Sequence, residues 1–496
     1  MRRFLRDIFL CIFSAILLIL SFPKPNLSIL AWVTLVPWFF ALDERRPKSA
    51  FFFSYLTGVI FFSGVLYWLT HVSTLGFSIL ALFLALFFAA FGVLFSICMR
   101  RGLCALLLLP CFWVFLEYIR NHLFTGFGWA LLGHSQYQNL AFIQISDITA
   151  VYGVSFLIVL VNAGLWQILK RNIFLPAICI FSSLALTLSY GYIKLHYPPQ
   201  KGEDIKVATI QGNIPQIVKW DPDARGYILE KYLRLTEIAS GERPDIIIWP
   251  ETSVPGYLQN DPALLQEISS LSKRIYPAYL LVGTPHEGER GKIYNSATLF
   301  FQGGIMRRYD KVHLVPFGEF IPLPAIFSRF SFAGLIGNFT PAEDYTIFCF
   351  SKEKQRIRLA ALICFEDVFP HLARRFTRRG ADLLVNMTND AWFKDSSEPE
   401  QHLQASVFRA VENRVNLVRS ANTGVSCFIN PWGKVLSRVR DASGQDVLVE
   451  GQKTESLKIV SMYSFYRAFG DVFAWGCSLV TLGALTIALR RKRKPL

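Results

Sequence analysis

The chain has 496 residues, of which 52% are hydrophobic, 15% are aromatic and 18% are charged. A soluble domain carries about 25% charged residues, so this composition argues against an all-soluble enzyme and against a disordered or coiled-coil chain. The 51 Lys and Arg exceed the 36 Asp and Glu, which gives a net charge of +15. Because the chain is both apolar and basic, we expect it to bind an anionic lipid surface rather than nucleic acid. The nine cysteines are scattered and predict neither a disulfide framework nor a metal site.

Apolar runs dominate residues 1–195, and a membrane helix needs about 20 such residues. We predict eight spans, at 4–22, 27–42, 49–69, 74–99, 103–119, 148–169, 173–195 and 473–489. The run 27–42 is short and is expected to be buried or tilted. A cleaved signal peptide is the alternative for the first run, but six further runs follow it closely. The predicted domains are therefore 1–195 with seven spans, 196–472 as a soluble domain, and 473–496 as a last span with a basic tail.

Basic residues cluster at alternate ends of the predicted spans. One cluster precedes the first span, three lie in the loops between spans 2 and 3, 4 and 5, and 6 and 7, and one follows the last span. In that order the clusters are Arg2, Arg3 and Arg6; Arg45, Arg46 and Lys48; Arg100 and Arg101; Lys170 and Arg171; Arg490 to Lys494. The positive-inside rule places all these clusters in the cytoplasm. The domain at 196–472 is then expected outside the cytoplasm, with both chain ends inside.

Two features of the membrane part are unusual. Glu117 and Arg120 lie three residues apart in an apolar run, on one helix face, which predicts a local ion pair. The segment 125–138 is rich in glycine and aromatic residues and is too short to span. It is either a re-entrant segment or an ordinary loop.

The soluble part alternates between strand and helix patterns. We predict strands at 205–210, 245–249, 278–283, 294–301, 304–309, 357–363 and 382–387, helices at 224–240, 262–275 and 399–416, and a hairpin of 425–429 with 434–438. This alternation favours an α/β layered sandwich.

Reactive side chains follow three of the predicted strands. Glu251 comes after the run DIIIW, as a general base or as a carboxylate that caps a turn. Cys364 follows RLAALI and precedes a helix start near Pro370, whose amino end would acidify the thiol; a buried structural cysteine is the alternative. Lys311 is either a cation for an oxyanion or a solvated loop lysine, and Glu319 would hold a base or a lysine in place.

The segment 320–335 is very apolar for a loop in a soluble domain. It is either a lid or arm lying against lipid, or a loop packed over the core. The chain shows neither a GxSxG motif nor a phosphate-binding loop.

Taken together, these segments resemble the nitrilase, or carbon–nitrogen hydrolase, superfamily. Over nearly the whole chain they resemble the apolipoprotein N-acyltransferase family. The matching residues are FWVFLEYIR at 112–120, FTGFGW at 124–129, QGNIPQ with KW at 211–220, WPE at 249–251, YDKVHLVPFGEFIP at 309–322, CFED at 364–367, NMTNDAWF at 386–393, HLQASVFRAVENRVNLVRSANTG at 402–424 and NPWGKV at 430–435. The resemblance implies an αββα sandwich carried by about eight transmembrane helices.

The resemblance also implies a Glu-Lys-Cys triad. Cys364 would be the nucleophile, Glu251 the general base, and Lys311 the cation that stabilises the tetrahedral intermediate. Glu319 would be a second, supporting carboxylate. Three more residues match positions around the family's pocket: Trp220, Phe365 and Glu366. Phe365 stands where the family usually has Tyr, so one hydroxyl is missing from that pocket.

The reaction implied by the resemblance has two steps. Cys364 takes an acyl chain from a phospholipid, expected to be phosphatidylethanolamine, and the resulting thioester acylates the α-amine of an apolipoprotein's lipid-modified amino-terminal cysteine. No metal, cofactor or nucleic acid takes part. The implied location is the inner membrane of a bacterial cell, as a multi-pass protein.

Two other functions remain open on the sequence. A membrane-tethered amidase or nitrilase that hydrolyses a small amide would share the triad, but it would not need eight spans. A non-enzymatic transporter with a large external domain is disfavoured, because few ionisable residues lie within the predicted spans.

Overall fold

The chain forms two compact units. The computed structural model describes residues 1–199, 202–219, 221–322, 338–352 and 355–490. A helical unit contains residues 1–198, 396–404 and 464–496, and an α/β unit contains residues 199–395 and 405–463. Three predicted features lie outside the described residues: Trp220, most of the arm at 320–335, and the basic tail after Arg490.

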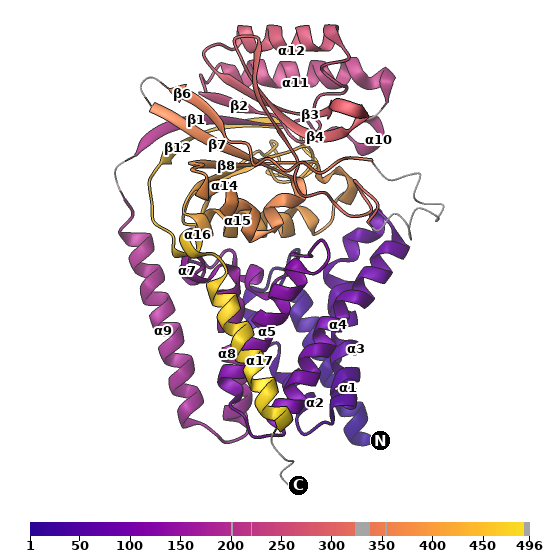
Figure 1. Cartoon of the computed structure of the whole chain (residues 1–496), viewed down its shortest axis with the longest axis vertical. Helices are drawn as coiled ribbons and strands as arrows, with labels where there is room; N and C mark the ends of the chain where they lie inside the picture. The colour runs from indigo at the N-terminus through magenta and orange to yellow at the C-terminus, as the bar shows by residue number, and fades with distance from the viewer. Residues whose placement is uncertain (200–201, 220, 323–337, 353–354, 491–496) are drawn as a thin grey trace. The chain divides into compact units, whose positions relative to one another are not determined.

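Long helices make up most of the helical unit (Figure 1). Within the described residues, five have the length and hydropathy of membrane spans: α3 (Pro47–Val65), α4 (Thr74–Met99), α8 (Val151–Leu169), α9 (Phe174–His196) and α17 (Val472–Arg490). Two more helices, α1 (Arg2–Leu20) and α5 (Ala105–His122), have 19 and 18 residues. The remaining α-helices of this unit are short: α2 (Val36–Leu42), α6 (Leu140–Ile143), α7 (Ser146–Thr149) and α16 (Phe465–Phe469). The unit is therefore a helical region with about five to six apolar spans.

The apolar run at 27–42 does not form one helix. A 3₁₀ helix at Ser28–Trp32 precedes α2, whose seven residues reach only about 10 Å, far less than a bilayer core. Asn162 of α8 satisfies the backbone at the break, because its Nδ2 donates to Ala31 O (2.9 Å) and its Oδ1 accepts from Leu35 N (2.8 Å). Most side chains after residue 33 of the run are buried, as expected, whereas Leu27, Ile29 and Val33 are exposed. The broken backbone is tolerated because protein groups replace the missing hydrogen bonds.

Residues 128–137 are a buried segment of the helical unit, in which a 3₁₀ helix (Leu132–Gln136) follows an irregular stretch. Glu117 Oε1 accepts from Leu132 N (2.7 Å), and Arg120 Nη2 donates to the carbonyls of Trp129 (3.1 Å) and Ala130 (3.3 Å). These two side chains thus hold this segment, since buried backbone groups without water need such partners. Their opposite charges also attract each other, as predicted, although no direct ion pair joins them within the described residues.

Two six-stranded sheets make up the centre of the α/β unit within the described residues. The first has the order β12 (Gly451–Ile459), β1 (Glu203–Gln211), β2 (Ile246–Ile248), β3 (Tyr279–Glu287), β4 (Ile293–Phe301), β5 (Gly304–Asp310). The second has the order β11 (Val435–Arg438), β10 (Cys427–Ile429), β9 (Asn416–Ala421), β8 (Leu383–Thr388), β7 (Gln355–Ile363), β6 (Phe348–Lys352). β1, β2 and β3 are parallel to one another, as are β7, β8 and β9. β12 and β4 flank the first set in antiparallel pairing, and β10 and β6 flank the second. The edge strands β5 and β11 pair antiparallel with β4 and β10.

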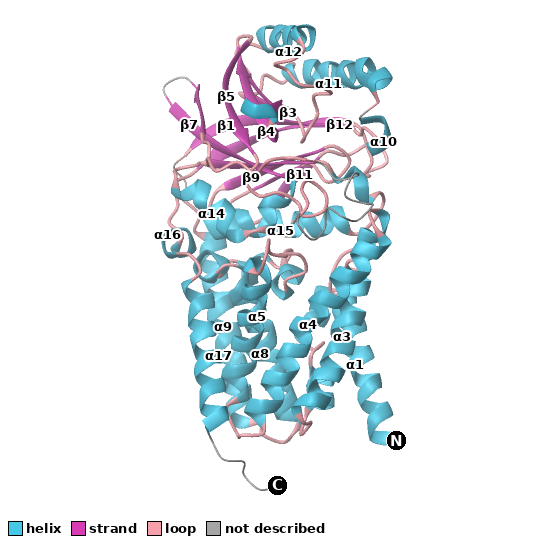
Figure 2. Ribbon diagram, turned by 45° about the vertical axis from the view of Figure 1, so that its right-hand side comes forward, coloured by secondary structure: helices cyan, strands magenta, loops and turns pink. Residues whose placement is uncertain are grey.

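The sheets pack face to face and helices cover their outer faces (Figure 2). α11 (Arg225–Ser240) and α12 (Pro262–Arg274) pack their apolar sides on the first sheet, around the stacked rings of Tyr232 and Trp249. α14 (Pro370–Arg378) and the part of α15 (Glu398–Asn413) that follows residue 404 belong to the α/β unit, on the side of the second sheet. Between the sheets, the Ser420 hydroxyl of β9 hydrogen-bonds to carbonyls of β1 and β2. This is the predicted layered αββα sandwich.

Most of the predicted elements of the α/β unit are present, with one clear boundary error. The predicted helix at 399–416 ends at Asn413, and β9 begins at Asn416. The pattern misled because residues 398–421 are almost continuously buried, so hydrophobic periodicity cannot separate helix from strand there. β6, β9 and β12 were not predicted.

Candidate active site

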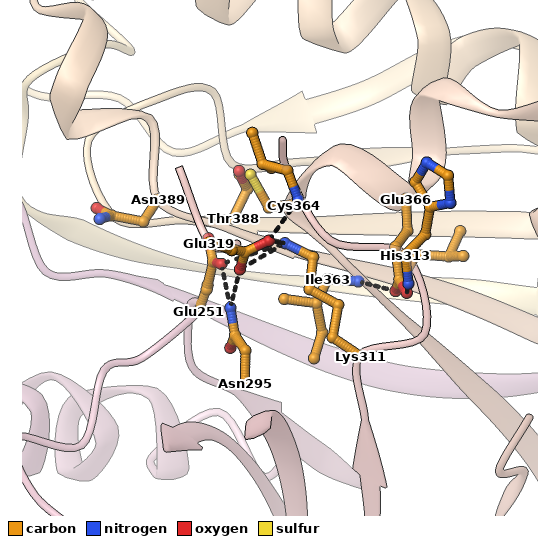
Figure 3. A network of polar contacts seen from close by, with 12 residues as sticks. Glu251, Asn295, Lys311, His313, Glu319, Ile363, Cys364, Glu366, Thr388 and Asn389 are labelled. Carbon is orange, nitrogen blue, oxygen red and sulfur yellow. Dashed lines mark hydrogen bonds and ion pairs between the residues drawn. The ribbon is translucent and has the colours of Figure 1, made fainter. Parts of the chain in front are cut away.

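Three strand ends bring together the side chains expected to react. Two residues lie between the end of β2 and Glu251, whereas Lys311 directly follows β5 and Cys364 directly follows β7. β2 and β5 belong to the first sheet and β7 to the second. Figure 3 shows these three side chains gathered with Glu319 at one place in the sandwich. The four predicted residues therefore form one cluster, although up to 113 positions separate them along the chain.

Lys311 lies between two carboxylates and is fully buried. Its Nζ is 3.0 Å from Oε1 and 2.8 Å from Oε2 of Glu319, and 3.8 Å from Oε1 of Glu251. Burial lowers the pKa of Lys311, but the carboxylates of Glu319 and Glu251 outweigh it, so the pKa is raised overall. Lys311 is thus a permanent cation in a place without bulk water.

Glu251 is a buried carboxylate suited to accept a proton. Burial raises its pKa, Lys311 lowers it and Glu319 raises it further, with a net increase above the ordinary value. A carboxylate with a raised pKa is a stronger base, and general-base efficiency is greatest when the pKa approaches the working pH.

Cys364 occupies a strained turn at the start of a 3₁₀ helix (Cys364–Val368). Its φ of +52° is in the left-handed region, which non-glycine residues adopt mainly where surrounding structure enforces it. Asn386 of β8 donates to the carbonyl of Cys364 at 3.0 Å and so helps to hold this turn. The strain turns the thiol out of the strand direction, as nucleophiles at strand–helix turns require.

The predicted acidification of Cys364 is wrong. Burial and the carboxylate of Glu251 raise the pKa of the thiol well above its ordinary value, although Lys311 lowers it. The nearest α-helix, α14, begins only at Pro370, and the 3₁₀ helix separates its amino end from Cys364. The thiol is therefore protonated at rest and needs a base to lose its proton.

Glu366 fastens the lysine loop to the end of the cysteine strand. Its carboxylate accepts from Tyr309 Oη (2.8 Å), Val312 N (2.9 Å), His313 N (3.0 Å) and Ile363 N (2.8 Å). Burial raises the pKa of Glu366 to about 7, while Lys311 and these hydrogen bonds lower it. Since it is fully buried and bound to backbone on both sides, Glu366 fixes the spacing of Lys311 and Cys364.

The predicted residue Phe365 is also a packing residue. Its ring is buried and stacks on the His313 ring at a centroid distance of 5.8 Å, with Phe369 in edge contact at 4.9 Å. These contacts hold the residue after the nucleophile in place.

Three residues at the site were not predicted: Lys219, Asn295 and Thr388. Lys219 Nζ donates to the carbonyl of Glu251 at 3.0 Å, and burial lowers its pKa to about 8. Asn295 of β4 bridges Glu251 and Glu319. Thr388, at the end of β8, lies beside Cys364 in Figure 3 and donates to Asp390. Lys219 and Thr388 lie within the matched runs KW and NMTNDAWF, which was an available signal, but Asn295 follows no distinctive pattern.

The arrangement can perform acyl transfer through a covalent intermediate. It offers a nucleophilic sulfur, a base and a fixed cation, which are the three groups that attack on a carbonyl needs. The carboxylate oxygens of Glu251 and Glu319 are engaged by the amine of Lys311 and the amide of Asn295.

The fold and the site together define a carbon–nitrogen hydrolase-type domain in a chain that also carries membrane helices. The family model described as carbon-nitrogen hydrolase matches residues 206–451. The model described as apolipoprotein N-acyltransferase N-terminal domain matches residues 14–164.

Relatives give the particular family. The chain is 40% identical to the apolipoprotein N-acyltransferase of Geobacter metallireducens, over 98% of this chain and 96% of that protein. It is 32% identical to that of Allorhizobium ampelinum, over 80% of this chain and 79% of that protein. Among solved structures, an amidase from Nesterenkonia sp. is similar with 19% identity and a TM-score of 0.40, covering 55% of this chain and 95% of that one. The chain belongs to the apolipoprotein N-acyltransferase family and is a multi-pass membrane protein.

Proposed function

We propose that this chain transfers a fatty acyl group from a phospholipid to an apolipoprotein. The acceptor is the free α-amine of the diacylglyceryl-cysteine at the apolipoprotein's amino terminus, and the donor is phosphatidylethanolamine. Membership of the apolipoprotein N-acyltransferase family supports the acyltransferase activity itself. The observation that carries the mechanism is the cluster of Glu251, Lys311 and Cys364 at three strand ends.

In the first step Cys364 attacks the carbonyl carbon of a phospholipid ester. Its thiol proton passes to the carboxylate of Glu251 as the carbon–sulfur bond forms, and the carbonyl oxygen becomes an oxyanion beside Lys311. The carbon–oxygen bond to glycerol then breaks, and protonated Glu251 returns its proton to the leaving oxygen. The products are a thioester on Cys364 and a lysophospholipid.

In the second step the α-amine of the apolipoprotein attacks the thioester. Glu251 removes a proton from the attacking nitrogen, and the oxyanion is again stabilised by Lys311. Collapse of the intermediate forms the amide and breaks the carbon–sulfur bond, and the sulfur regains its proton. Glu319 takes part indirectly, because its two oxygens hold the amine of Lys311.

We further propose that the α/β unit faces the side of the membrane opposite to the cytoplasm, with both chain ends in the cytoplasm of a bacterial cell. The alternating basic clusters of the sequence support this orientation. In this orientation the site would be on the same side of the inner membrane as lipid-modified apolipoproteins held in its outer leaflet. A reporter fused after residue 202 would test it, and activity of a cytoplasm-only reporter would contradict it.

Intact mass measurement tests the acyl-enzyme. Protein purified from membranes is expected to carry a fatty-acyl adduct that hydroxylamine removes, and Cys364→Ala is expected to carry none. Purified phosphatidylethanolamine should restore the adduct after hydroxylamine treatment. If the active wild-type protein is never acylated by phospholipid but hydrolyses small amides, it is instead a membrane-tethered amidase.

A further inference from the structure

Asn295 touches both carboxylates of the site. It lies on β4 and is 3% exposed. Its Nδ2 is 2.7 Å from Oε1 of Glu251 and 2.9 Å from Oε1 of Glu319, while its own carbonyl accepts from the backbone N–H of Lys311 at 2.8 Å. One residue therefore contacts the base and the supporting carboxylate through its side chain (Figure 3), and the backbone of Lys311 through its own backbone.

The orientation of the Asn295 amide follows from its neighbours. Ionised carboxylates only accept hydrogen bonds, so the NH₂ end must face Glu251 and Glu319, and each of its two N–H groups serves one of them. The Oδ1 atom at the other end is buried and has no hydrogen-bond partner within the described residues. A buried acceptor left in this way opposes folding, so its presence in a native site points to a role in function.

Charged groups on several elements face Glu251: Lys311, Glu319 and Lys219, whose Nζ donates to the backbone carbonyl of Glu251 at 3.0 Å. The two lysines favour the ionised state of Glu251, and Glu319 opposes it. Lys311 contacts Glu319 closely, at 2.8 Å, but Glu251 only at 3.8 Å. Each carboxylate disfavours the charge of the other. The amide of Asn295 supplies a short hydrogen bond to each without adding charge, so it favours the ionised state of Glu251, which Lys311 serves less well.

We propose that Asn295 is a positioning residue for proton transfer, which holds Glu251 as an ionised base at a fixed place between Glu319 and Cys364. The inference rests on Glu251 being the base in the proposed function. The proposal predicts that Glu251 accepts the proton of Cys364 and that the hydrogen bond from Asn295 controls the proton affinity of Glu251. It also leaves the amine of Lys311 available to an oxyanion, since the amide rather than the amine holds Glu251.

The pH profile of Cys364 alkylation by iodoacetamide tests this proposal without any lipid donor. The purified full-length protein is expected to react more slowly as the pH falls and Glu251 becomes protonated. Asn295→Asp replaces the donor by a third carboxylate in the same volume, so this acid limb should move up by at least about one pH unit. Asn295→Ala removes the donors without adding charge and should move the limb less, with about a tenfold slower reaction at pH 7.

Asn260→Asp is the matched control. Asn260 also donates to a carboxylate, Glu287 at 2.7 Å, but it is exposed. This variant loses the same kind of bond and gains the same charge on the same unit, and its acid limb should stay in place. If Asn295→Asp and Asn295→Ala both keep the wild-type limb, the positioning role is wrong.

A Glu251→Gln arm separates this inference from the proposed function. If Glu251→Gln reacts as fast as the wild type at every pH, the assignment of the base fails and the inference fails with it. If Glu251→Gln loses reactivity while Asn295→Asp keeps the wild-type limb, only the role of Asn295 fails. Should Asn295→Asp not fold, as judged by circular dichroism, the shift expected for Asn295→Ala decides the question.

Discussion

The two units bury polar side chains for different purposes. In the α/β unit, buried charges of both signs face one another at strand ends, as Lys311 does with Glu251 and Glu319. In the helical unit, buried polar side chains such as Asn162 and Glu117 instead serve backbone groups that helix breaks leave without partners. The contrast teaches that the partner of a buried polar group matters, because contacts among titratable side chains shift their pKa values, as at Glu251 and Lys311. Buried polar groups that bind backbone signal architecture.

The largest effect is expected for Lys311→Met, which breaks the charge cluster of the α/β unit. The variant keeps the length of the side chain but removes the cation that stabilises the oxyanion, so acylation of Cys364 should slow by about 10²–10³-fold. Acyl-adduct formation followed by intact mass measures this rate. Lys292→Met, at an exposed lysine, is the control and should react normally. An unchanged rate in Lys311→Met would remove the lysine from the mechanism.

A smaller effect is expected for Glu366→Gln, because Glu366 belongs to the α/β unit but bonds mainly to backbone. In the variant an amide NH₂ replaces one carboxylate oxygen, and this donor would face the N–H and O–H donors that the oxygen now accepts from. The free energy of unfolding should therefore fall by about 2–3 kcal/mol. A thermal unfolding scan measures the loss. Glu237→Gln breaks only an exposed ion pair with Arg274 and should leave the transition nearly unchanged. A Glu366→Gln protein as stable as the wild type would contradict the fastening role.

Asn162→Leu tests the helical side of the comparison. It removes the hydrogen bonds to Ala31 O and Leu35 N, so stability should fall by about 1–3 kcal/mol, while iodoacetamide should still alkylate Cys364 at the wild-type rate. Asn172→Leu, at an exposed asparagine, should change neither quantity. If Cys364 is alkylated more slowly in the folded Asn162→Leu protein, Asn162 also affects the site in the α/β unit, and the distinction between the two units is wrong.

The smallest effect is expected for Lys219→Met. Burial lowers the pKa of Lys219 to about 8, so its amine is charged below that pH and loses its proton above it. The positive charge favours ionisation of nearby Cys364, so wild-type alkylation should reach a shoulder near pH 8 instead of rising steadily. Lys219→Met should lack this shoulder and react a few-fold more slowly at pH 7. Lys273→Met, at an exposed lysine of α12, should behave as the wild type. A shoulder that survives in Lys219→Met would assign it to another group.

Sequence alone determined the class of chain and the chemistry-bearing residues. Apolar length is a local property, so the long membrane helices α3, α4, α8, α9 and α17 follow from it directly. The alternation of strand and helix patterns predicted the sandwich, and the matched motifs named Glu251, Lys311 and Cys364 before any geometry was known. Each of these signals is contained in a short stretch of chain.

Tertiary structure alone decided the state of these residues. The raised pKa of the Cys364 thiol, opposite to the expected shift, depends on burial and on a carboxylate 113 positions away. The bridge made by Asn295 depends on strand pairing, and the break at 27–42 depends on Asn162, more than 100 positions distant. The composition that first indicated a membrane protein carries no such information, because electrostatic and hydrogen-bond energies depend on distances in space and not on distances along the chain.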